Sequence, residues 1–300
     1  MYLGRILYNF AGITLNKLLT MNKNPLFSLL AVAILLMCSC GSNASGSKSS
    51  SNDSTLCQFS NIKFEKLYSY CDDEGDTLYF DNSFKALWPE VINGKPSTAL
   101  QQALFTAMTD SGGLNQLDKV VDFLLDPSNY TEVDAKRLVP VKAVKYDDNK
   151  LSTSEVNVVM EDFTDRLLTY RLSTYSYMAG GAHGIYANNY ATYDLKTEKG
   201  ITLDDIIADT ALLRTVTLKS IKQTLNFDTE DLILPDNGLL PLPRDFFIDG
   251  SVLHVVYQVY EIASYAQGMI DAPIYPYLLK PEEIKTLYTP YGLELLELTE

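Results

Sequence analysis

Tyr175-Ser-Tyr-Met-Ala-Gly-Gly-Ala-His-Gly184 is the stretch of this 300-residue chain that most constrains its fold. It completes residues 167–177, whose pattern is that of a β-strand, and then turns sharply. Gly180, Gly181 and Gly184 allow positive φ angles, so they predict a tight turn after the strand. His183 in this turn is one of only two histidines in the chain. The sequence therefore offers few groups for acid–base chemistry near neutral pH.

The hydrophobic periodicity of the rest of the chain predicts an α+β fold. We expect an antiparallel sheet meander with helices packed on it, arranged as two closely associated subdomains at 56–186 and 187–300. A β-hairpin around the turn Asp-Glu-Gly-Asp76 opens the first subdomain and ends at Trp88-Pro89. The predicted strands are 59–70, 77–84, 139–144, 155–159, 167–177, 187–195, 246–248 and 252–260, and the predicted helices are 97–107, 114–125, 130–136, 203–221 and 281–288.

The N-terminal segment has the features of an export signal. Residues 1–39 include a basic start after Met21, which this pattern predicts as the initiator, and a short apolar run over 26–37. The run is shorter than a normal membrane span. It ends at Ser39-Cys40, which resembles the cleavage site of a bacterial lipoprotein, so we expect Cys40 to be lipidated. The alternative is an ordinary secretory signal with two incidental cysteines.

A tether and an acidic body follow the predicted signal. Residues 40–55 are rich in Gly and Ser and predict a flexible linker from the lipidated cysteine. Beyond Cys40 the chain has 21 basic and 38 acidic residues, a net charge of −17 with histidine neutral. Such a surface repels phosphate backbones and disfavours nucleic acid as a ligand. It would attract a cationic partner, although ordinary solubility also explains the charge.

Cys57 and Cys71 are the cysteines outside the predicted signal. Export places them in an oxidising compartment, so we predict a disulfide between them. The alternative is two free thiols. No structural zinc site is predicted at these cysteines because histidines are missing nearby. We predict no metal and no cofactor.

Four segments in the C-terminal part of the chain resemble a bacterial domain of unknown function, numbered 3298, which usually follows a smaller partner domain numbered 4163. They are 180–184, 193–205, 247–253 and 260–268. The pair occurs in the outer part of the lysozyme-sensing anti-sigma factor RsiV and beside a peptidoglycan deacetylase domain. The resemblance implies an envelope-facing recognition module of α+β fold. A sigma-binding segment and a deacetylase Asp/His motif do not occur here, so neither signalling nor deacetylation is carried over.

Two classes of function agree with these patterns. The first is a lipid-anchored binding module of the cell envelope, attached to the inner or outer membrane, with its folded body in the periplasm or at the cell surface. Its ligand would be cell-wall glycan or a cationic, lysozyme-like protein. The second is a hydrolase of envelope polymers centred on His183, with Ser173, Ser176 or Ser264 as nucleophile. No complete catalytic motif supports the hydrolase.

The candidate ligand loop consists of glycines, a histidine and tyrosines. Tyrosine offers a large contact area with a polar tip, which suits carbohydrate or protein ligands. The structural interpretation of the loop is a tight connection whose histidine hydrogen-bonds the neighbouring backbone. His254 lies in an apolar strand and is interpreted as a satisfied core or cross-strand residue. The candidate residues are Gly180, Gly181, His183, Gly184, Tyr186 and Tyr265.

Overall fold

The computed structural model describes residues 57–299, except 110–112, 144–147, 226, 228–230 and 236. The predicted signal, Cys40 and the linker lie outside the described residues. Two compact units make up the chain. Unit 1 contains the residues up to Val158 together with Tyr175–Gly184, and unit 2 contains Val159–Thr174 and Ile185–Glu300. The units therefore interleave along the sequence, whereas the sequence predicted a single boundary between 186 and 187.

Unit 1 begins with the predicted hairpin. Strands β1 (Gln58–Cys71) and β2 (Thr77–Ile92) pair antiparallel along their whole length. The Asp72 side chain accepts hydrogen bonds from the Glu74 and Asp76 backbone N–H groups and so closes the turn. The predicted end at Trp88-Pro89 is wrong, because β2 continues to Ile92. Proline is tolerated there because β2 pairs with a second long strand only as far as Ala86.

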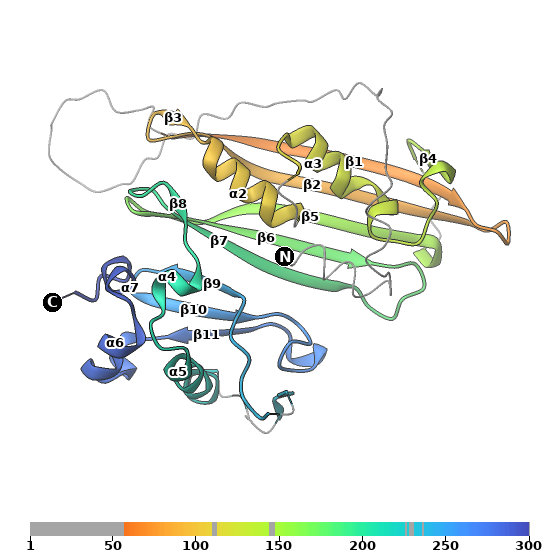
Figure 1. Ribbon diagram of the computed structural model, residues 1–300. Helices are drawn as coiled ribbons and strands as arrows, with labels where there is room; N and C mark the ends of the chain where they lie inside the picture. Colours follow the sequence, from red (N-terminus) through yellow and green to blue (C-terminus); the bar gives the residue numbers. More distant parts are fainter. Residues whose placement is uncertain are drawn as a thin grey trace, which may run out of the picture. The chain divides into compact units, whose positions relative to one another are not determined.

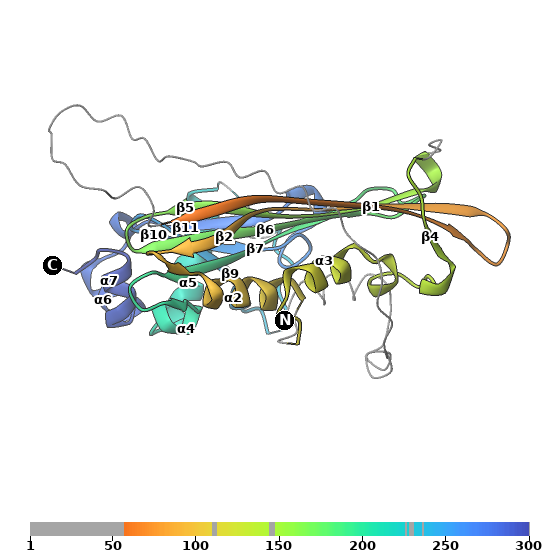
Figure 2. The same cartoon turned by 90° about the horizontal axis from the view of Figure 1, so that it is seen from above.

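Two helices cover one face of this hairpin (Figure 2). Helix α2 (Thr98–Thr109) follows the short strand β3 (Lys95–Pro96), and α3 (Leu117–Leu125) comes next. Alternate residues of β2 from Phe80 to Trp88 are buried beneath them, and the Trp88 and Phe105 ring centroids lie 5.2 Å apart. The buried Asn82 amide donates to the Leu125 carbonyl at 2.9 Å and so satisfies an acceptor at the end of α3.

One strand pair departs from the predicted antiparallel meander. Strand β5 (Leu151–Phe163) pairs parallel with β2, from Tyr79↔Leu151 to Ala86↔Val158. A parallel pair needs a long crossover connection, and α2 and α3 lie within it. The α+β class is confirmed. The larger sheet also contains β4 (Leu138–Pro140), β6 (Leu167–Tyr177), β7 (Ile185–Asp194) and β8 (Lys199–Gly200), in the order β4-β1-β2-β5-β6-β7-β8 with β3 on β2.

Unit 2 also has a three-stranded antiparallel sheet, in the order β11-β10-β9 (Figure 1). As predicted, β9 (Asp245–Asp249) and β10 (Val252–Tyr257) form a hairpin, and Gly250 has a φ of +56° in its turn. The long helix predicted from Leu203 is instead two helices. The Asp209 side chain accepts from the N–H groups of Ala211 and Leu212 and starts the second one. The remaining elements are β11 (Ile270–Ile274), α4 (Leu203–Ile206), α5 (Thr210–Gln223), α6 (Pro281–Leu287) and α7 (Pro290–Leu295).

Other short segments adopt 3₁₀ conformation. The helix predicted over 130–136 is wrong, since the chain there has single 3₁₀ turns on either side. The Asp126 and Asp134 side chains cap the N-terminal ends of these turns by accepting from the Ser128 and Lys136 N–H groups, and such local hydrogen bonds compete with a continuous helix. The 3₁₀ turns are Pro127–Asn129, Ala135–Arg137, Asp148–Lys150, Tyr265–Gln267 and Pro276–Leu278.

The predicted disulfide is wrong. Cys57 and Cys71 are free cysteines, and they lie at opposite ends of β1. At about 3.3 Å per residue their Cα atoms are roughly 45 Å apart. A disulfide requires Cα atoms within about 7 Å. The strand predicted over 59–70 already lies between the two cysteines, and because it is extended along its length both remain thiols.

A buried ion pair anchors the C-terminal helices in unit 2. Arg166 binds Asp194 through two nitrogens, Nε to Oδ1 at 2.7 Å and a second nitrogen to Oδ2 at 3.1 Å. The Tyr291 hydroxyl donates to the same carboxylate at 2.7 Å. Burial alone would raise the pKa of Asp194, but the hydrogen bonds outweigh it and lower the pKa to about 2. The network therefore stabilises the ionised form of Asp194.

We predict that Asp194→Asn lowers the free energy of unfolding by about 3 kcal/mol near pH 7, because Arg166 loses its buried counter-charge. The folded-state pKa of Asp194 is depressed from 3.8, so this contribution is present above about pH 4 and is lost as the pH falls towards about 2. Urea unfolding of both proteins across that range measures it. Glu294→Gln is the control, since the Glu294 carboxylate that Arg166 also contacts is largely exposed. An equal loss at every pH would contradict the ion-pair explanation.

Candidate functional site

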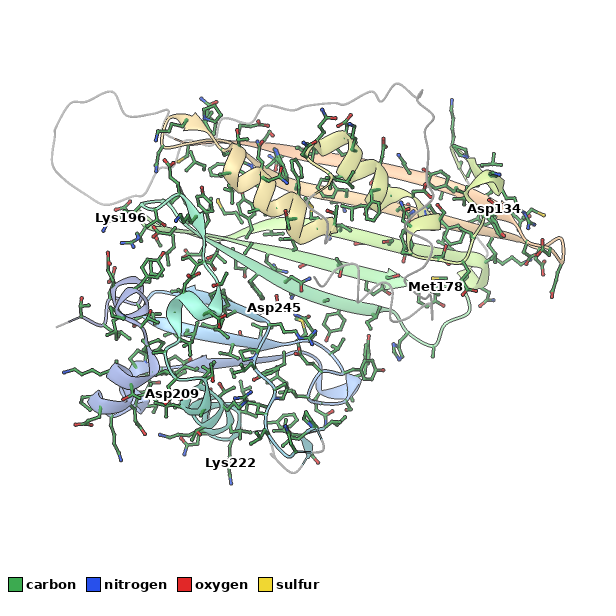
Figure 3. The ribbon with its side chains drawn as sticks, viewed as in Figure 1. Asp134, Met178, Lys196, Asp209, Lys222 and Asp245 are labelled. Carbon is green, nitrogen blue, oxygen red and sulfur yellow. The ribbon has the colours of Figure 1, made fainter. Side chains whose placement is uncertain are left out.

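The glycines of the loop between β6 and β7 are required by its geometry. Gly180 has a φ of +76°, which confirms the predicted positive angle at this residue alone. At Gly181 a Cβ atom would lie 2.9 Å from the Met178 carbonyl oxygen, and Figure 3 labels Met178 in this loop. At Gly184 it would lie 2.4 Å from the Tyr175 ring. Gly181 and Gly184 are therefore needed for close approach rather than for positive φ.

His183 is an exposed residue of this loop in unit 1. Its Nδ1 atom lies 2.9 Å from the Gly184 carbonyl oxygen. A histidine that contacts the neighbouring backbone is what we expected if the loop is a tight structural connection rather than a ligand site. A backbone carbonyl is neither a nucleophile nor a carboxylate that could orient a catalytic histidine. The geometry of the loop thus gives no support to a hydrolase centred on His183.

The other two candidate residues lie in unit 2, where they form a cluster of tyrosines. The Tyr186 and Tyr265 rings meet edge to face, with centroids 6.1 Å apart. Tyr260, which the sequence analysis did not select, lies 5.6 Å from Tyr265. We call Tyr186, Tyr260 and Tyr265 the tyrosine cluster. A Cβ atom at Gly268 would come within 3.1 Å of the Tyr186 hydroxyl, so a side chain there would crowd the cluster.

Tyr260 is held in an unfavourable backbone conformation. Its φ is +66°, in the left-handed region that bulky residues avoid at a cost on the order of 1–3 kcal/mol. Its neighbours maintain this turn, since the Gln258 N–H donates to the Glu261 carboxylate at 2.9 Å and the Glu261 N–H donates to the Gln258 carbonyl. The Tyr260 side chain is 47% exposed. The backbone conformation that places this ring at the surface therefore lowers the stability of the fold.

A glutamine amide positions β7 beside the small sheet. The side chain of Gln258 donates to the Asn188 carbonyl at 2.6 Å and accepts from the Asn188 N–H at 3.1 Å. It also donates to Asp245 Oδ2 at 3.0 Å, and the Tyr190 N–H donates to the same carboxylate. Figure 3 labels Asp245 at the start of β9. We call Gln258, Asn188 and Asp245 the Gln258 network.

The carboxyl group of Asp245 is hard to ionise. Burial is the main cause, with a smaller contribution from the nearby Glu261 carboxylate, and together they raise the pKa of Asp245 to about 6. The hydrogen bonds from Gln258 and Tyr190 oppose this rise without cancelling it. Burial also raises the pKa of Glu261. A perturbed carboxyl pair of this kind is a signal of a functional region, although structural networks produce it too.

A second group of aromatic residues lies across β7, β9 and β10. The Tyr190 and Phe247 rings are stacked with centroids 4.6 Å apart, and Phe247 and His254 are stacked at 4.3 Å. We call these three residues the aromatic ladder. His254 Nδ1 lies 2.8 Å from Asp271 Oδ1 on β11. The cross-strand position predicted for His254 is thus observed, but its carboxylate partner was not predicted.

The structure did not bring the six candidate residues together within one unit. Four belong to unit 1, and Tyr186 and Tyr265 belong to unit 2. Sequence reasoning missed Tyr260, the Gln258 network and the aromatic ladder. The alternation of Tyr186, Asn188 and Tyr190 on β7 could have indicated a common face. No sequence signal marks the positive φ of Tyr260.

Residues 195–275 match the model of a family described as a protein of unknown function, DUF3298. This chain contains a DUF3298 domain. The DUF3298 domain includes the small sheet, Asp245, Gln258, Tyr260 and Tyr265, whereas β7 with Tyr186 and Tyr190 precedes it. The resemblance to family 3298 is therefore confirmed for this segment. The partner domain numbered 4163 and the anti-sigma and deacetylase contexts stay predictions.

Two solved structures of DUF3298 proteins are similar to this chain. A family member from Bacteroides fragilis has 18% sequence identity and a TM-score of 0.54, and the match covers 81% of this chain and 98% of that one. A protein from Pseudomonas aeruginosa has 14% identity and a TM-score of 0.47, with coverage of 77% and 95%. The likeness to the Bacteroides protein shows the fold alone. No curated protein matches the chain.

Metal clusters and membrane-spanning helices are both missing from the described residues. These residues contain no group of three or more histidine, cysteine or acidic side chains that could hold a metal ion. Within the same residues no helix is both long enough and apolar enough to span a membrane.

We predict that Asp245→Asn changes the pH dependence of stability. The folded-state pKa of Asp245 is raised from 3.8 to about 6, so the native protein loses stability relative to the variant as the pH rises from about 4 to 6. Thermal unfolding midpoints of the two proteins across this interval measure the effect.

Asp205→Asn is the control of opposite sign. Hydrogen bonds from Thr202 lower the pKa of Asp205, so its contribution to stability is lost as the pH falls below the usual carboxyl range. Parallel pH profiles for the native protein and Asp245→Asn would show that the Asp245 carboxyl is not perturbed.

Proposed function

We propose that this protein is a lipid-tethered recognition module of the bacterial cell envelope, and that unit 2 binds cell-wall glycan through the tyrosine cluster. The observation that carries the proposal is Tyr260, whose ring is half-exposed on a backbone with a φ of +66°. A strained conformation persists only where the surrounding structure enforces it, and such residues concentrate at ligand sites. A tyrosine with no role beyond packing would gain stability by adopting an ordinary φ.

The chemistry of the tyrosine cluster suits a sugar ring. A pyranose has an apolar face of C–H groups and a rim of hydroxyls, and tyrosine combines a flat apolar ring with a hydroxyl at its edge. The three rings lie at 5.6 and 6.1 Å with differing tilts, so they form a shaped surface rather than a closed stack. Asp245 and Gln258 of the neighbouring network are buried, so the polar groups of this surface are the tyrosine hydroxyls. Aromatic surface with a few placed polar groups is typical of small-ligand sites.

The predicted lipid anchor gives this site its cellular setting. Cys40 follows an export signal, and the Gly/Ser-rich residues 41–55 separate it from β1. An N-acylated, diacylated cysteine carries enough acyl chain to hold a soluble body at a bilayer surface. Some fifteen residues of flexible linker would let that body reach polymer some tens of ångströms from the membrane.

A cationic protein is the second candidate ligand, because the chain beyond Cys40 carries a net charge of −17. A surface of this charge speeds the approach of a basic protein, and the effect weakens as salt screens it. The charge is spread over the chain and does not single out the tyrosine cluster. Glycan is therefore the ligand that the geometry supports better.

We predict that Tyr260→Gly weakens the binding of soluble peptidoglycan glycan strands about tenfold while it preserves or raises the thermal unfolding midpoint. Glycine accepts the positive φ without strain, so this substitution removes the ring and relieves the backbone together. Calorimetric titration and thermal unfolding of the full chain in detergent measure the two effects. Tyr277→Ala is the matched control, since Tyr277 is 77% exposed outside the cluster.

Two results would contradict this assignment. If Tyr260→Gly binds glycan as the native protein does, the tyrosine cluster is not the site. If the native protein binds no glycan but binds lysozyme-like proteins with an affinity that falls steeply with salt, the cationic protein is the ligand.

We predict that mass spectrometry of the mature protein finds an acylated Cys40 at the N-terminus. Cys40→Ala should release the protein from the membrane fraction or leave its signal uncleaved, because the anchor and the cleavage site share this residue. Cys38→Ala is the control, since Cys38 follows the bulky Met37 and should not be modified. An unmodified mature N-terminus at another residue would contradict the lipoprotein assignment.

A further inference from the structure

The aromatic ladder is a built arrangement rather than a chance contact. Phe247 and His254 are direct cross-strand partners on β9 and β10, and their rings are within 17° of parallel. Tyr190 of β7 adds a third ring at 24° to Phe247. All three residues are partly exposed. Three stacked rings in a row are therefore partly accessible at the surface of unit 2.

His254 is oriented for a hydrogen bond to a ligand. Asp271 holds the Nδ1 atom of His254 at 2.8 Å, and this contact fixes the orientation of the ring. The Nε2 atom of His254 has no hydrogen-bond partner among the described residues. The His254 side chain is 17% exposed and that of Asp271 is 47% exposed. A fixed imidazole with one open nitrogen is suited to a polar ligand group.

Polar side chains from β5, β6 and β7 surround the Tyr190 end of the ladder. Arg171 binds Glu161 at 2.7 Å, and the charges of both act on the Tyr190 hydroxyl. The Ser173 hydroxyl donates to Asn188 Oδ1 at 2.6 Å. These residues supply both donors and acceptors at the surface of unit 2. The carboxylates of Glu161 and Asp271 disfavour an anionic ligand here.

The ladder and the tyrosine cluster share one face of β7. Tyr186 and Tyr190 are four residues apart in an extended strand, so their side chains point to the same face about 13 Å apart. Asn188 lies between them on that face. Tyr186 contacts Tyr265 of the cluster, and Tyr190 contacts Phe247 of the ladder. A chain molecule lying along β7 would therefore meet both groups.

We propose that the aromatic ladder, with Asp271 and Arg171, is a second carbohydrate subsite, and that unit 2 binds a glycan chain extended along β7. This inference rests on the proposed glycan function of the tyrosine cluster. The cluster offers ring faces for the apolar side of a sugar. The ladder offers partly accessible rings together with His254 Nε2 and Arg171, which suit hydroxyl and acetamido groups. The two subsites therefore recognise different parts of the polymer.

The number of subsites predicts how affinity depends on chain length. A single disaccharide repeat of peptidoglycan occupies one subsite, whereas a strand of several repeats reaches both. Binding at the second subsite is then intramolecular, and it raises affinity without any new contact at the first. We expect strands of several repeats to bind the full chain in detergent at least about tenfold more tightly than the disaccharide.

The test compares two glycan lengths on two sets of variants by calorimetric titration. His254→Ala should reduce the affinity for long strands about tenfold and leave the affinity for the disaccharide unchanged. Tyr260→Gly, at the other subsite, should weaken both ligands. Asp271→Asn is the second ladder variant, because the Asp271 side chain is 47% exposed and a neutral amide holds the His254 ring less strongly than the carboxylate does. Thermal unfolding of each variant checks the fold.

The outcomes separate the two proposals. Equal affinity of the native protein for short and long glycans, or unchanged binding of long strands by His254→Ala and Asp271→Asn, overturns the second subsite and leaves the tyrosine cluster as the binding site. Failure of the native protein to bind glycan of either length overturns the proposed function itself. Loss of long-strand affinity alone in both ladder variants supports the extended site.

Discussion

The side-chain amide of Gln258 is the interaction on which the candidate sites of unit 2 depend. It donates to the carbonyl and accepts from the N–H of Asn188, which is the pattern that a neighbouring peptide group would make. The Gln258 side chain thereby links β7 to the small sheet through the same two hydrogen bonds that a peptide group of an adjacent strand would form. Tyr186 and Tyr190 lie two residues on either side of Asn188. The positions of the tyrosine cluster and of the aromatic ladder therefore both depend on this contact.

Several features around β7 lower the free energy of unfolding. Asp245 is buried with a carboxyl pKa raised to about 6, and Tyr260 has a positive φ. The amide of Asn189, also buried, has no hydrogen-bond partner among the described residues. Each feature lowers stability by an amount comparable to a lost hydrogen bond. The bidentate Arg166–Asp194 pair elsewhere in unit 2 is satisfied. The buried hydroxyls of Tyr170, Thr217 and Tyr288 have no hydrogen-bond partner among the described residues, so costs of this kind also occur away from the proposed binding surface.

Much of the local structure could be predicted because local chemistry specifies it. The β1–β2 hairpin and the strand at 167–177 follow from turn residues and alternation. Predictions failed where distant contacts decide. The parallel pairing of β2 with β5 depends on a crossover through two helices. The Cys57–Cys71 disulfide failed because the intervening strand, which was itself predicted, is extended and holds the two cysteines far apart. The break at Asp209 in the predicted long helix is the exception, because it depends on a local contact, the capping of Ala211 and Leu212 by the Asp209 side chain.

The sequence by itself determined the α+β class, most of the strands, the turn with a positive φ at Gly180, and the family resemblance confirmed for the DUF3298 domain. These features depend on residues close together in the chain, whose propensities act without tertiary contacts. Only the tertiary structure decided which aromatic residues meet. Tyr190, Phe247 and His254 come from three strands, and their stacking depends on register and on the Gln258 contact. Register between distant strands is set by packing of the whole unit, so no local pattern could specify it.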